Sequence, residues 1–443
     1  MKDIKIKSKA STPLKKTLST IPGDKSISHR AVIIGALANN TSHFNNFLCS
    51  EDCLNTMRIF QKLNIPIEIN TQEKTLKIEG KGYHGLRQPK DVLDVGNSGT
   101  GIRLITGILS AQPFQSTITG DTSIQSRPMD RIITPLKKMG ASVTGITYPE
   151  KKDSYPPLVI KGNTTLSPIQ YSLPIASAQV KSALLLASLF SQEPSTIIEK
   201  KASRNHTEIM LQTFGAAISV SDSKITCSGQ RPLQFPSVNS LTIPSDFSSA
   251  AFFIVLGLLR KNTVLILKNI GLNPTRSALL NILIKMGGRI SLSNVNKTEF
   301  EQSADIKVES SQLKNVDIPQ HLIPFLIDEI PILSIAGLFA TGPFKISHAK
   351  ELRVKESDRI QSIADMIESM GGNVTISEDG FAFEPRQNNS PFVCHSHGDH
   401  RIAMSAIIAA ISQNVQATIH NCDCIDTSFP NFIHILEESL QVL

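Results

Sequence analysis

One structural unit recurs six times along this chain of 443 residues, and the repetition limits the folds open to it. Each copy opens with small or polar residues, continues as a nearly all-apolar helical stretch and leads into a short β-branched strand. Successive copies start about 70 to 80 residues apart. The six openings begin at Lys25, Asn97, Ser177, Ser245, Asp328 and Asp399.

A second, more amphipathic helix follows in each copy and ends at a residue that favours left-handed backbone. Glycine or asparagine at this place ends a helix and turns the chain into the next strand. The sixth copy stops inside its second helix. We therefore predict a unit of helix, strand, helix and strand. The turn residues are Asn64, Gly140, Gly215, Gly287 and Gly371.

The apolar helices predict how the six units are grouped. A helix without a polar face must be enclosed by other elements, so three units can pack around their own apolar helices, with sheets and amphipathic helices outside. We expect an α/β fold of two lobes with three repeats each. Because the sixth copy is truncated, the strand at residues 3–7 should complete the second lobe. The predicted lobes are residues 22–243, and residues 1–21 plus 244–443.

The charge balance favours small anionic ligands. Lys and Arg number 45 and Asp and Glu number 38, a modest positive excess that suits anionic partners. The chain has no Trp and only 5% aromatic residues, so the stacking platforms of nucleic-acid-binding proteins are missing. Polar residues gather at the starts of the buried helices, whose positive ends would face the gap between the lobes. This arrangement predicts a cleft that binds phosphorylated, carboxylated metabolites.

The remaining composition indicates a soluble, cytoplasmic protein. The six cysteines form no secreted disulfide framework in a chain of this length. The N-terminus lacks the apolar region of a signal peptide, and the longest apolar run, residues 250–259, is half a membrane span.

Residues 353–359, RVKESDR, carry the strongest indication of chemistry. Apolar helical periodicity begins directly after them, and Ser357 or Asp358 is placed to cap that helix. Lys355, Glu356 and Arg359 would then gather where amide groups and the helix dipole favour anions. We interpret the segment as an anion site with its own acid or base. A solvated, capped helix start is the alternative.

Two further stretches place anion-binding groups at helix starts. PGDKSISHR supplies Lys25, Ser26 and Arg30, an ammonium, a hydroxyl and a guanidinium. The glycine-rich turn at residues 94–103 lets backbone N–H groups approach an anion at Gly96, Gly99 and Gly101, although it matches neither common nucleotide-binding loop. An ordinary cap and a plain tight turn are the alternatives.

Several other polar residues have equally ordinary alternatives. Arg127 precedes a proline in a loop, where a surface guanidinium is the simpler reading. Ser177, Gln179, Ser203 and Arg204 stand at two further helix starts and fit a ligand site or simple capping.

Two stretches hold residue types that serve in proton transfer or in metal binding. Asp328 and Glu329 lie in an apolar sequence, which would raise the pKa of a carboxylate and suit it to proton transfer, with capping as the alternative. Residues 394–401 hold one Cys, three His and Asp399 in spacings that match no metal motif. We expect no metal there, with Asp399 capping a helix and Arg401 facing the cleft.

Nine motifs in order over nearly the whole chain resemble the 5-enolpyruvylshikimate-3-phosphate synthase (3-phosphoshikimate 1-carboxyvinyltransferase) family of enolpyruvyl transferases. The family's two lobes of three repeats close over the substrates. Its enzymes transfer the enolpyruvyl group of phosphoenolpyruvate to the 5-hydroxyl of shikimate 3-phosphate and release phosphate, through a tetrahedral intermediate and without metal or organic cofactor. The reaction belongs to chorismate and aromatic amino acid biosynthesis. The motifs are PGDKSISHR, GNSGTGIRL, SRPMDR, IASAQVKSA, SRNHTE, LIDEIP, RVKESDR, GDHRIAM and TSFPNF.

The resemblance implies a role for each candidate residue. Asp328 would take the substrate's hydroxyl proton. Glu356, together with Lys25, would protonate the methylene carbon and later remove a proton from the resulting methyl group. Shikimate 3-phosphate would be bound by Lys25, Ser26, Arg30, Ser177, Gln179, Ser203, Arg204, Asp328 and Lys355. Phosphoenolpyruvate would be bound by Lys25, Asn97, Gly99, Arg127, Gln179, Arg359 and Arg401.

Two positions bear on how far the resemblance extends. Thr427 stands where some relatives carry a lysine, so one phosphate contact is absent or replaced. Gly99 stands where glyphosate-tolerant relatives carry alanine, which implies inhibition by glyphosate in competition with phosphoenolpyruvate.

Two other functions remain open from the sequence. One is that of UDP-N-acetylglucosamine 1-carboxyvinyltransferase, although the reactive cysteine usual in its loop is missing from residues 120–128. The other is a non-catalytic anion-binding protein of the same fold, against which Asp328 and Glu356 argue, because carboxylates weaken an anion site unless they transfer protons. We expect a monomer that binds neither nucleic acid nor membrane.

Overall fold

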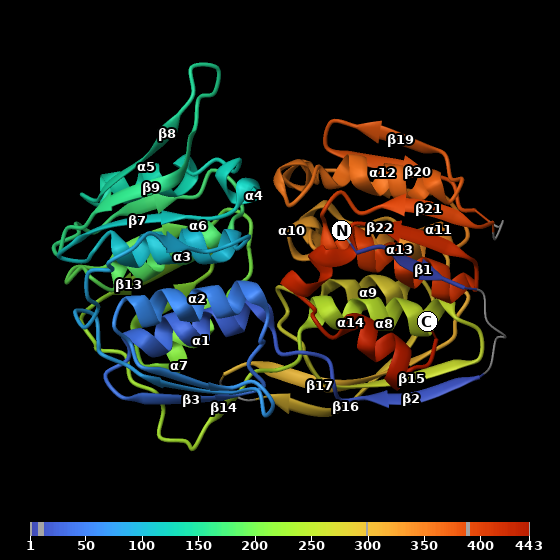
Figure 1. Ribbon diagram of the computed structural model, residues 1–443, viewed down its shortest axis with the longest axis horizontal. Coiled ribbons are helices and arrows are strands. Elements are labelled where there is room, and N and C mark those ends of the chain that lie inside the picture. The colour runs from blue at the N-terminus through green and yellow to red at the C-terminus, as the bar shows by residue number, and fades with distance from the viewer. Residues whose placement is uncertain (1, 8–12, 298–299, 387–389, 443) are drawn as a thin grey trace. The chain divides into compact units, whose positions relative to one another are not determined.

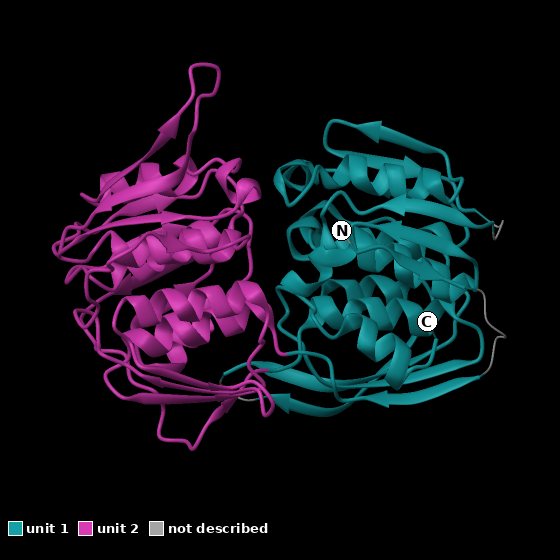
Figure 2. Ribbon diagram, viewed as in Figure 1, with its two compact units in different colours: residues 1–22, 244–443 teal, residues 23–243 magenta. Residues whose placement is uncertain are grey.

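The chain divides into two compact units. The computed structural model describes residues 2–7, 13–297, 300–386 and 390–442. Unit 1 comprises residues 1–22 and 244–443, and unit 2 comprises residues 23–243 (Figure 2). The limits predicted for the lobes differ from this division only at residue 22, which belongs to unit 1.

Within the described ranges, each unit contains three small sheets (Figure 1). In unit 2 the strand orders are β14-β3-β5-β4, β6-β7-β9-β8 and β10-β11-β13-β12. These strands are β3 (Thr41–Asn45), β4 (Ile67–Asn70), β5 (Thr75–Glu79), β6 (Leu93–Asp94), β7 (Gln115–Thr119), β8 (Ser142–Thr147), β9 (Ser154–Lys161), β10 (Gln170–Ser172), β11 (Ser195–Ile198), β12 (Ala217–Ser221), β13 (Lys224–Ser228) and β14 (Leu241–Thr242).

Unit 1 repeats this four-stranded order in one sheet, and its other two sheets have three described strands each. Its strand orders are β16-β17-β15-β2, β18-β20-β19 and β1-β22-β21. The strands are β1 (Ile4–Ile6), β2 (Leu14–Leu18), β15 (Thr263–Gly271), β16 (Arg289–Lys297), β17 (Gln302–Glu309), β18 (Phe344–Ile346), β19 (Val374–Ser377), β20 (Gly380–Phe383), β21 (Phe392–His395) and β22 (Ala417–His420).

The strand pairing corrects one detail of the predicted repeat. A hairpin, rather than a single strand, follows the second helix in copies one to five, as in β4–β5 and β8–β9. The second strand of each hairpin pairs antiparallel with the strand that follows the buried helix, so the first hairpin strand lies at the sheet edge. In the sixth sheet β1 takes the place of that hairpin strand, with Ile4 opposite Ile419 on β22. The N-terminal strand is thus paired with the last strand of unit 1.

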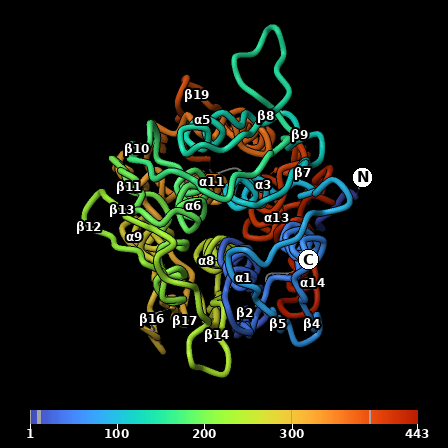
Figure 3. The backbone as a smooth tube through the Cα atoms, turned by 90° about the vertical axis from the view of Figure 1, so that its left-hand side faces the viewer, coloured from blue at the N-terminus to red at the C-terminus, as the bar shows by residue number. Residues whose placement is uncertain are grey.

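The six apolar stretches form the buried helices that the repeat predicted. They are α1 (Lys25–Leu37), α3 (Gly99–Leu109) and α6 (Ala178–Ser188) in unit 2, and α8 (Phe247–Leu259), α11 (Ile330–Leu338) and α13 (His400–Gln413) in unit 1. In unit 1 the three helices pack against one another, and in unit 2 α3 contacts both α1 and α6. In α8 every residue from Phe247 to Leu258 is buried. Figure 3, which looks onto unit 2, shows its three helices with strands of its three sheets around them.

The second helices end as the glycine pattern predicted. They are α2 (Glu51–Lys62), α5 (Asp130–Lys138), α7 (His206–Thr213), α9 (Ala278–Lys285) and α12 (Arg359–Ser369). The turn residues have left-handed backbone, with φ of 72° at Asn64, 89° at Gly140, 76° at Gly215, 96° at Gly287 and 75° at Gly371. The sixth copy ends in α14 (Phe432–His434) and a short π-helix at Ile435–Ser439.

The described helices are short or carry polar residues. No single one of them is long and apolar enough to cross a membrane. The segments Gln320–Leu326 and Ile330–Leu338 reach that length and composition only as a pair, bent by 113°.

Candidate active site

A buried guanidinium brings three carboxylates together in unit 1. Arg359 opens α12, and its side chain is 0% exposed. Its Nε donates to Asp399 Oδ2 at 2.7 Å, its Nη2 to Glu356 Oε2 at 2.6 Å and its Nη1 to Asp328 Oδ1 at 3.2 Å. Asp328 and Glu356 belong to the fifth copy of the repeat and Asp399 to the sixth, so the fold assembles the cluster from three segments that are separated in sequence.

The charges in this cluster stabilise one another. Burial by itself lowers the pKa of the Arg359 guanidinium, but Asp399, Glu356 and Asp328 raise it above its ordinary value. Burial would likewise raise the pKa of the Asp399 carboxyl, yet Arg359 holds it below its ordinary range. Both groups therefore stay ionised without contact with water, as paired buried charges do.

The helix start at residues 353–359 is built as predicted. Asp358 caps α12 and accepts from the amides of Ile360 and Gln361 at 3.1 and 3.3 Å. Lys355 Nζ lies 3.6 Å from Asp328 Oδ1, the same carboxylate oxygen that pairs with Arg359. Lysine, glutamate and arginine of this segment thus gather at one helix N-terminus.

The surroundings of Asp328 differ from the apolar setting expected of it. Its carboxylate lies against two cations, Arg359 and Lys355, because the chain folds residues 355–359 onto the segment before α11. The neighbouring Glu329 occupies the N-cap position of α11 without a side-chain capping bond and accepts a hydrogen bond from Ser248 instead. The Asp328 side chain is 15% exposed, so it keeps a face open to a ligand.

Asp399 and Arg401 complete the cluster in unit 1. Asp399 caps α13, as predicted, by accepting from the Arg401 amide at 2.9 Å. The Arg401 side chain turns back toward the start of α11, where its Nη1 donates to the Asp328 carbonyl at 2.7 Å. It lies 3.6 Å from Glu329 Oε1. Arg401 is therefore held beside the cluster that Arg359 organises.

A second group of candidate residues lies at the helix starts of unit 2. Asp24 caps α1 and accepts from the Ile27 amide at 2.9 Å. Lys25, whose side chain is 25% exposed, forms an ion pair with Asp52 in the first turn of α2. Sequence reasoning missed Asp52, because an acidic residue in a first helical turn usually serves the helix dipole.

Arg30 points from α1 toward α6 and α7. Two hydroxyl groups hold its side chain: Nε donates to Thr207 Oγ1 at 2.6 Å, and Nη2 donates to Ser182 Oγ at 2.9 Å. Its Nη1 donates to the Ser26 carbonyl at 2.8 Å, which ties two predicted ligands of one substrate together.

The glycine-rich turn places several cationic groups around Gly99. A Cβ atom at this residue would lie 2.9 Å from Nη1 of both Arg103 and Arg127, and 3.9 Å from Gln179 Nε2. Arg103 donates to Gln179 Oε1 at 2.9 Å and to the Gly99 carbonyl at 3.1 Å. Arg103 was not among the predicted residues. Of Gly96, Gly99 and Gly101 in this turn, only Gly96 has left-handed backbone, with φ of 60°.

The other candidate residues lie at helix starts or in loops. Asn97 donates to Asp121 Oδ2 at 2.6 Å. Ser177 caps α6 by accepting from the Val180 amide at 3.4 Å, and Ser203 and Arg204 directly precede the start of α7. Thr427, where some relatives carry lysine, donates to the Cys424 carbonyl at 2.7 Å.

The residues with described positions contain no group of three His, Cys, Asp or Glu side chains able to hold a metal ion. In the stretch considered for metal, His395 stacks on His420 with ring centroids 4.6 Å apart, and His397 lies 3.3 Å from Asp365. All six cysteines are free thiols.

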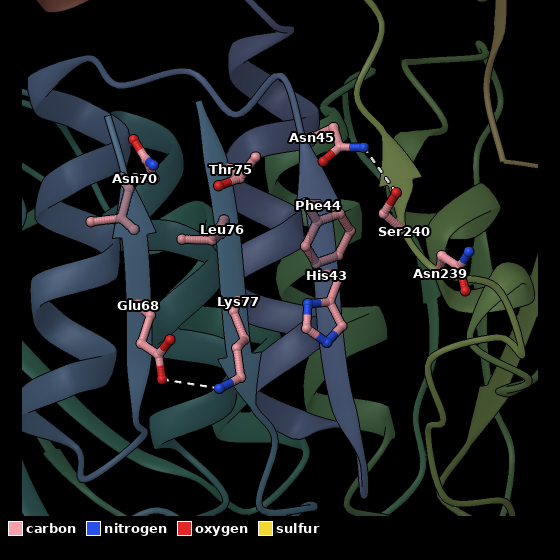
Figure 4. A pocket seen from close by; sticks show the side chains of 11 residues that line it. His43, Phe44, Asn45, Glu68, Asn70, Thr75, Leu76, Lys77, Asn239 and Ser240 are labelled. Atoms are coloured by element: carbon pink, nitrogen blue, oxygen red, sulfur yellow. Dashed lines mark hydrogen bonds and ion pairs between the residues drawn. The ribbon is translucent and has the colours of Figure 1, made fainter. Parts of the chain in front are cut away.

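A hollow of about 440 Å³ lies apart from the predicted residues. It is on the sheet β14-β3-β5-β4, where His43, Lys77 and Ser240 are among its lining residues (Figure 4). None of the candidate residues named from the sequence lines it.

A family model described as EPSP synthase (3-phosphoshikimate 1-carboxyvinyltransferase) matches residues 8–436. The chain belongs to the EPSP synthase family. A 3-phosphoshikimate 1-carboxyvinyltransferase of Thermoanaerobacter sp. (strain X514) is 43% identical over 430 residues, covering 97% of this chain and 98% of the relative. One from Streptococcus sanguinis (strain SK36) is 44% identical over 418 residues, covering 94% and 95%.

Solved structures agree with this EPSP synthase assignment. The EPSP synthase of Acinetobacter baumannii superposes with a TM-score of 0.85 at 39% identity, covering 99% of this chain and 98% of that one. The enolpyruvyl transferase NikO of Streptomyces tendae, at 14% identity and a TM-score of 0.75, shares the fold and covers 99% and 96%. The predicted family and fold are confirmed. So is the enzyme class, 3-phosphoshikimate 1-carboxyvinyltransferase (EC 2.5.1.19), a transferase of aromatic amino acid biosynthesis that uses phosphoenolpyruvate.

Proposed function

We propose that this EPSP synthase transfers the enolpyruvyl group of phosphoenolpyruvate to the 5-hydroxyl of shikimate 3-phosphate by addition and elimination. The observation that carries the mechanism is the pairing of Asp328 and Glu356 on one buried guanidinium, Arg359. Two partly exposed carboxylates beside fixed cations are the groups that proton transfer within an anion site requires.

Unit 2 supplies most of the groups for shikimate 3-phosphate. Arg30 is held by two hydroxyls, so its guanidinium is oriented before substrate arrives. Pre-oriented donors of this kind cost no reorganisation during the reaction. The proposed ligands are Lys25, Ser26, Arg30, Ser177, Gln179, Ser203 and Arg204 from unit 2, and Asp328 and Lys355 from unit 1.

Phosphoenolpyruvate needs cations for both its phosphate and its carboxylate. Arg127 and Gln179 lie around Gly99, while Arg401 is held at the Asp328 carbonyl beside the carboxylate cluster. The proposed ligands are Lys25, Asn97, Gly99, Arg127, Gln179, Arg359 and Arg401. Each well-aimed charged contact to a developing charge is typically worth about 3 kcal/mol.

The proton transfers follow from these positions. Asp328 accepts the proton of the 5-hydroxyl while the hydroxyl oxygen of shikimate 3-phosphate bonds to C2 of phosphoenolpyruvate. In the same step Glu356 with Lys25 delivers a proton to C3. The product of this step is a tetrahedral intermediate. Its C–O bond to phosphate then breaks as a proton leaves the new methyl group for Glu356, and the departing phosphate takes the proton held by Asp328. This step forms the enol ether and returns both carboxyl groups to their starting states. Exclusion of water during these steps protects the intermediate from hydrolysis.

We further propose that the chain works as a monomer in the cytoplasm, with no cofactor beyond its two substrates.

The substrate assignment is tested by phosphate release from phosphoenolpyruvate with either acceptor. Shikimate 3-phosphate should support turnover and UDP-N-acetylglucosamine should not. Turnover with the sugar nucleotide alone would refute the assignment.

The role of Glu356 is tested by replacing it with alanine. Glu356→Ala should lose turnover by at least about 100-fold while it retains shikimate 3-phosphate binding measured by calorimetry. Glu378→Ala is the matched control, because Glu378 is 79% exposed and pairs only at the surface with Lys350. Equal loss of binding and turnover would mean that Glu356 holds the substrate rather than transferring its protons.

A further inference from the structure

A buried lysine in unit 2 holds two glutamates together. The Lys181 side chain, near the start of α6, is 1% exposed, and its Nζ lies 2.8 Å from Glu199 Oε2 and 2.7 Å from Glu208 Oε1. The same Nζ donates to the Ser203 carbonyl at 3.4 Å. The glutamate side chains are only 6% and 4% exposed. Burying three charges is costly in free energy, and apolar side chains of the same volume would pack as well, so the cluster points to a role beyond packing.

The cluster joins three successive segments of the chain. Lys181 belongs to α6, Glu199 follows β11 and Glu208 lies in the first turn of α7. The loop between the two glutamates contains Ser203 and Arg204, both proposed ligands of shikimate 3-phosphate. One ammonium therefore fixes both ends of this loop against the helix that begins with Ser177 and Gln179.

A bridge of hydroxyl groups runs beside the ion cluster, one residue along each helix. Ser182 follows Lys181, and Thr207 precedes Glu208; the two hydroxyl oxygens lie 2.6 Å apart. Both hydroxyls accept from Arg30, at 2.9 and 2.6 Å. The position of the Arg30 guanidinium thus depends on the same spacing of α6 and α7 that Lys181 and Glu208 set.

The charges show why the lysine is needed. When all three groups are ionised, two negative charges face one positive charge. Glu199 Oε1 and Glu208 Oε2 are buried without a hydrogen-bond partner among the residues whose positions are described. Without the ammonium, the two carboxylates would repel each other in a site from which water is excluded, and α6, α7 and the loop would move apart.

We propose that Lys181, Glu199 and Glu208 form a positioning cluster that sets the geometry of the shikimate 3-phosphate ligands without touching the substrate. The inference rests on the proposed function. It adds a buried charge network that acts through Arg30, Ser203 and the start of α6, and it assigns the effect to one substrate.

The experiment replaces Lys181 with methionine, which is similar in length but uncharged. Binding of shikimate 3-phosphate is measured by calorimetry without phosphoenolpyruvate, together with KM for each substrate and the melting temperature. Lys181→Met should raise the Kd for shikimate 3-phosphate by about 10- to 100-fold, as small misplacements of binding groups do. The KM for phosphoenolpyruvate should stay within about twofold of wild type. Of its proposed ligands only Gln179 lies on α6, and the others are outside the segments that Lys181 joins.

A matched control removes a close ion pair elsewhere. Lys268→Met breaks the 2.6 Å pair with Asp305 in unit 1, which contacts none of the proposed ligands. It should leave both substrate constants unchanged.

If Lys181→Met fails to fold, Glu199→Gln serves instead, because it removes one carboxylate charge and leaves Lys181 paired with Glu208. It should weaken shikimate 3-phosphate binding by a smaller factor at nearly unchanged melting temperature.

The outcomes separate this inference from the proposed function. Wild-type protein that fails to bind or turn over shikimate 3-phosphate overturns the proposed function and this inference with it. If wild type is active, two results overturn the positioning role alone. One is unchanged shikimate 3-phosphate binding in the folded variant, and the other is an equal loss for both substrates.

Discussion

Replacing Asp399 with asparagine tests how the carboxylate cluster is held together. Asp399 is fully buried and accepts from Arg359 Nε at 2.7 Å and from the Arg401 amide at 2.9 Å. Removing one partner of a buried ion pair typically costs 3–5 kcal/mol, but Glu356 and Asp328 would remain on the guanidinium, so we expect about 3 kcal/mol. For a unit of about 220 residues this lowers Tm by roughly 6–12 °C.

The assay is differential scanning calorimetry, with Asp365→Asn as the matched control. Asp365 is 39% exposed and pairs with His397 at 3.3 Å, so its loss should cost at most about 1 kcal/mol. Because Arg359 outweighs burial and holds the pKa of the Asp399 carboxyl below its ordinary value, its stabilisation is present above about pH 4 and is lost as pH falls through the folded-state pKa. The difference in Tm between variant and wild type should therefore narrow at low pH. A Tm of Asp399→Asn within about 2 °C of wild type at pH 7 would correspond to a loss of only about 1 kcal/mol or less, and would refute the reasoning.

Three other measurements probe separate parts of the molecule. Gly99→Ala places a Cβ 2.9 Å from Nη1 of Arg103 and Arg127, so the guanidinium groups must shift; KM for phosphoenolpyruvate should rise about tenfold and glyphosate inhibition should weaken, and unchanged kinetics would contradict this. Burial, Lys25 and Arg30 lower the pKa of His29 well below its usual value, so stability should fall as pH drops below about 6.5; His29→Gln should flatten that dependence in urea titrations, and an unaltered slope would exclude His29 as its source. Gly215→Ala meets no atom within 4 Å but keeps a φ of 76°, so its unfolding free energy should drop by about 1–2 kcal/mol from backbone strain alone, whereas a stabilised variant would contradict that origin.

The repeated helices could be predicted from the sequence because their signals are local. An all-apolar helix must be enclosed, and residues such as Asn64 and Gly371 are suited to the left-handed turns that end the outer helices. The hairpins were missed because the order of strands in a sheet is set by pairing between distant segments, which periodicity does not reveal.

The same limit applies to the candidate site. Lys355, Glu356 and Arg359 could be grouped in advance because one helix start presents them together. The sequence does not show that Asp328 would lie against two cations, because its partners are about 30 residues away and reach it only through tertiary packing. Lys181 sits within an apolar run, and only the fold reveals that two glutamates surround it.

The pairing of β1 with β22 has a consequence for how the protein is made. A ribosome delivers residues 4–6 before any other strand, yet their partners at 417–419 emerge last. Unit 2 is complete once residue 243 has left the ribosome and has no need of that leading segment. Strand β1 therefore stays without its partner strand through almost the whole of translation. A bulky fusion at the N-terminus would accordingly interfere with the folding of unit 1, which is completed last, rather than with that of unit 2.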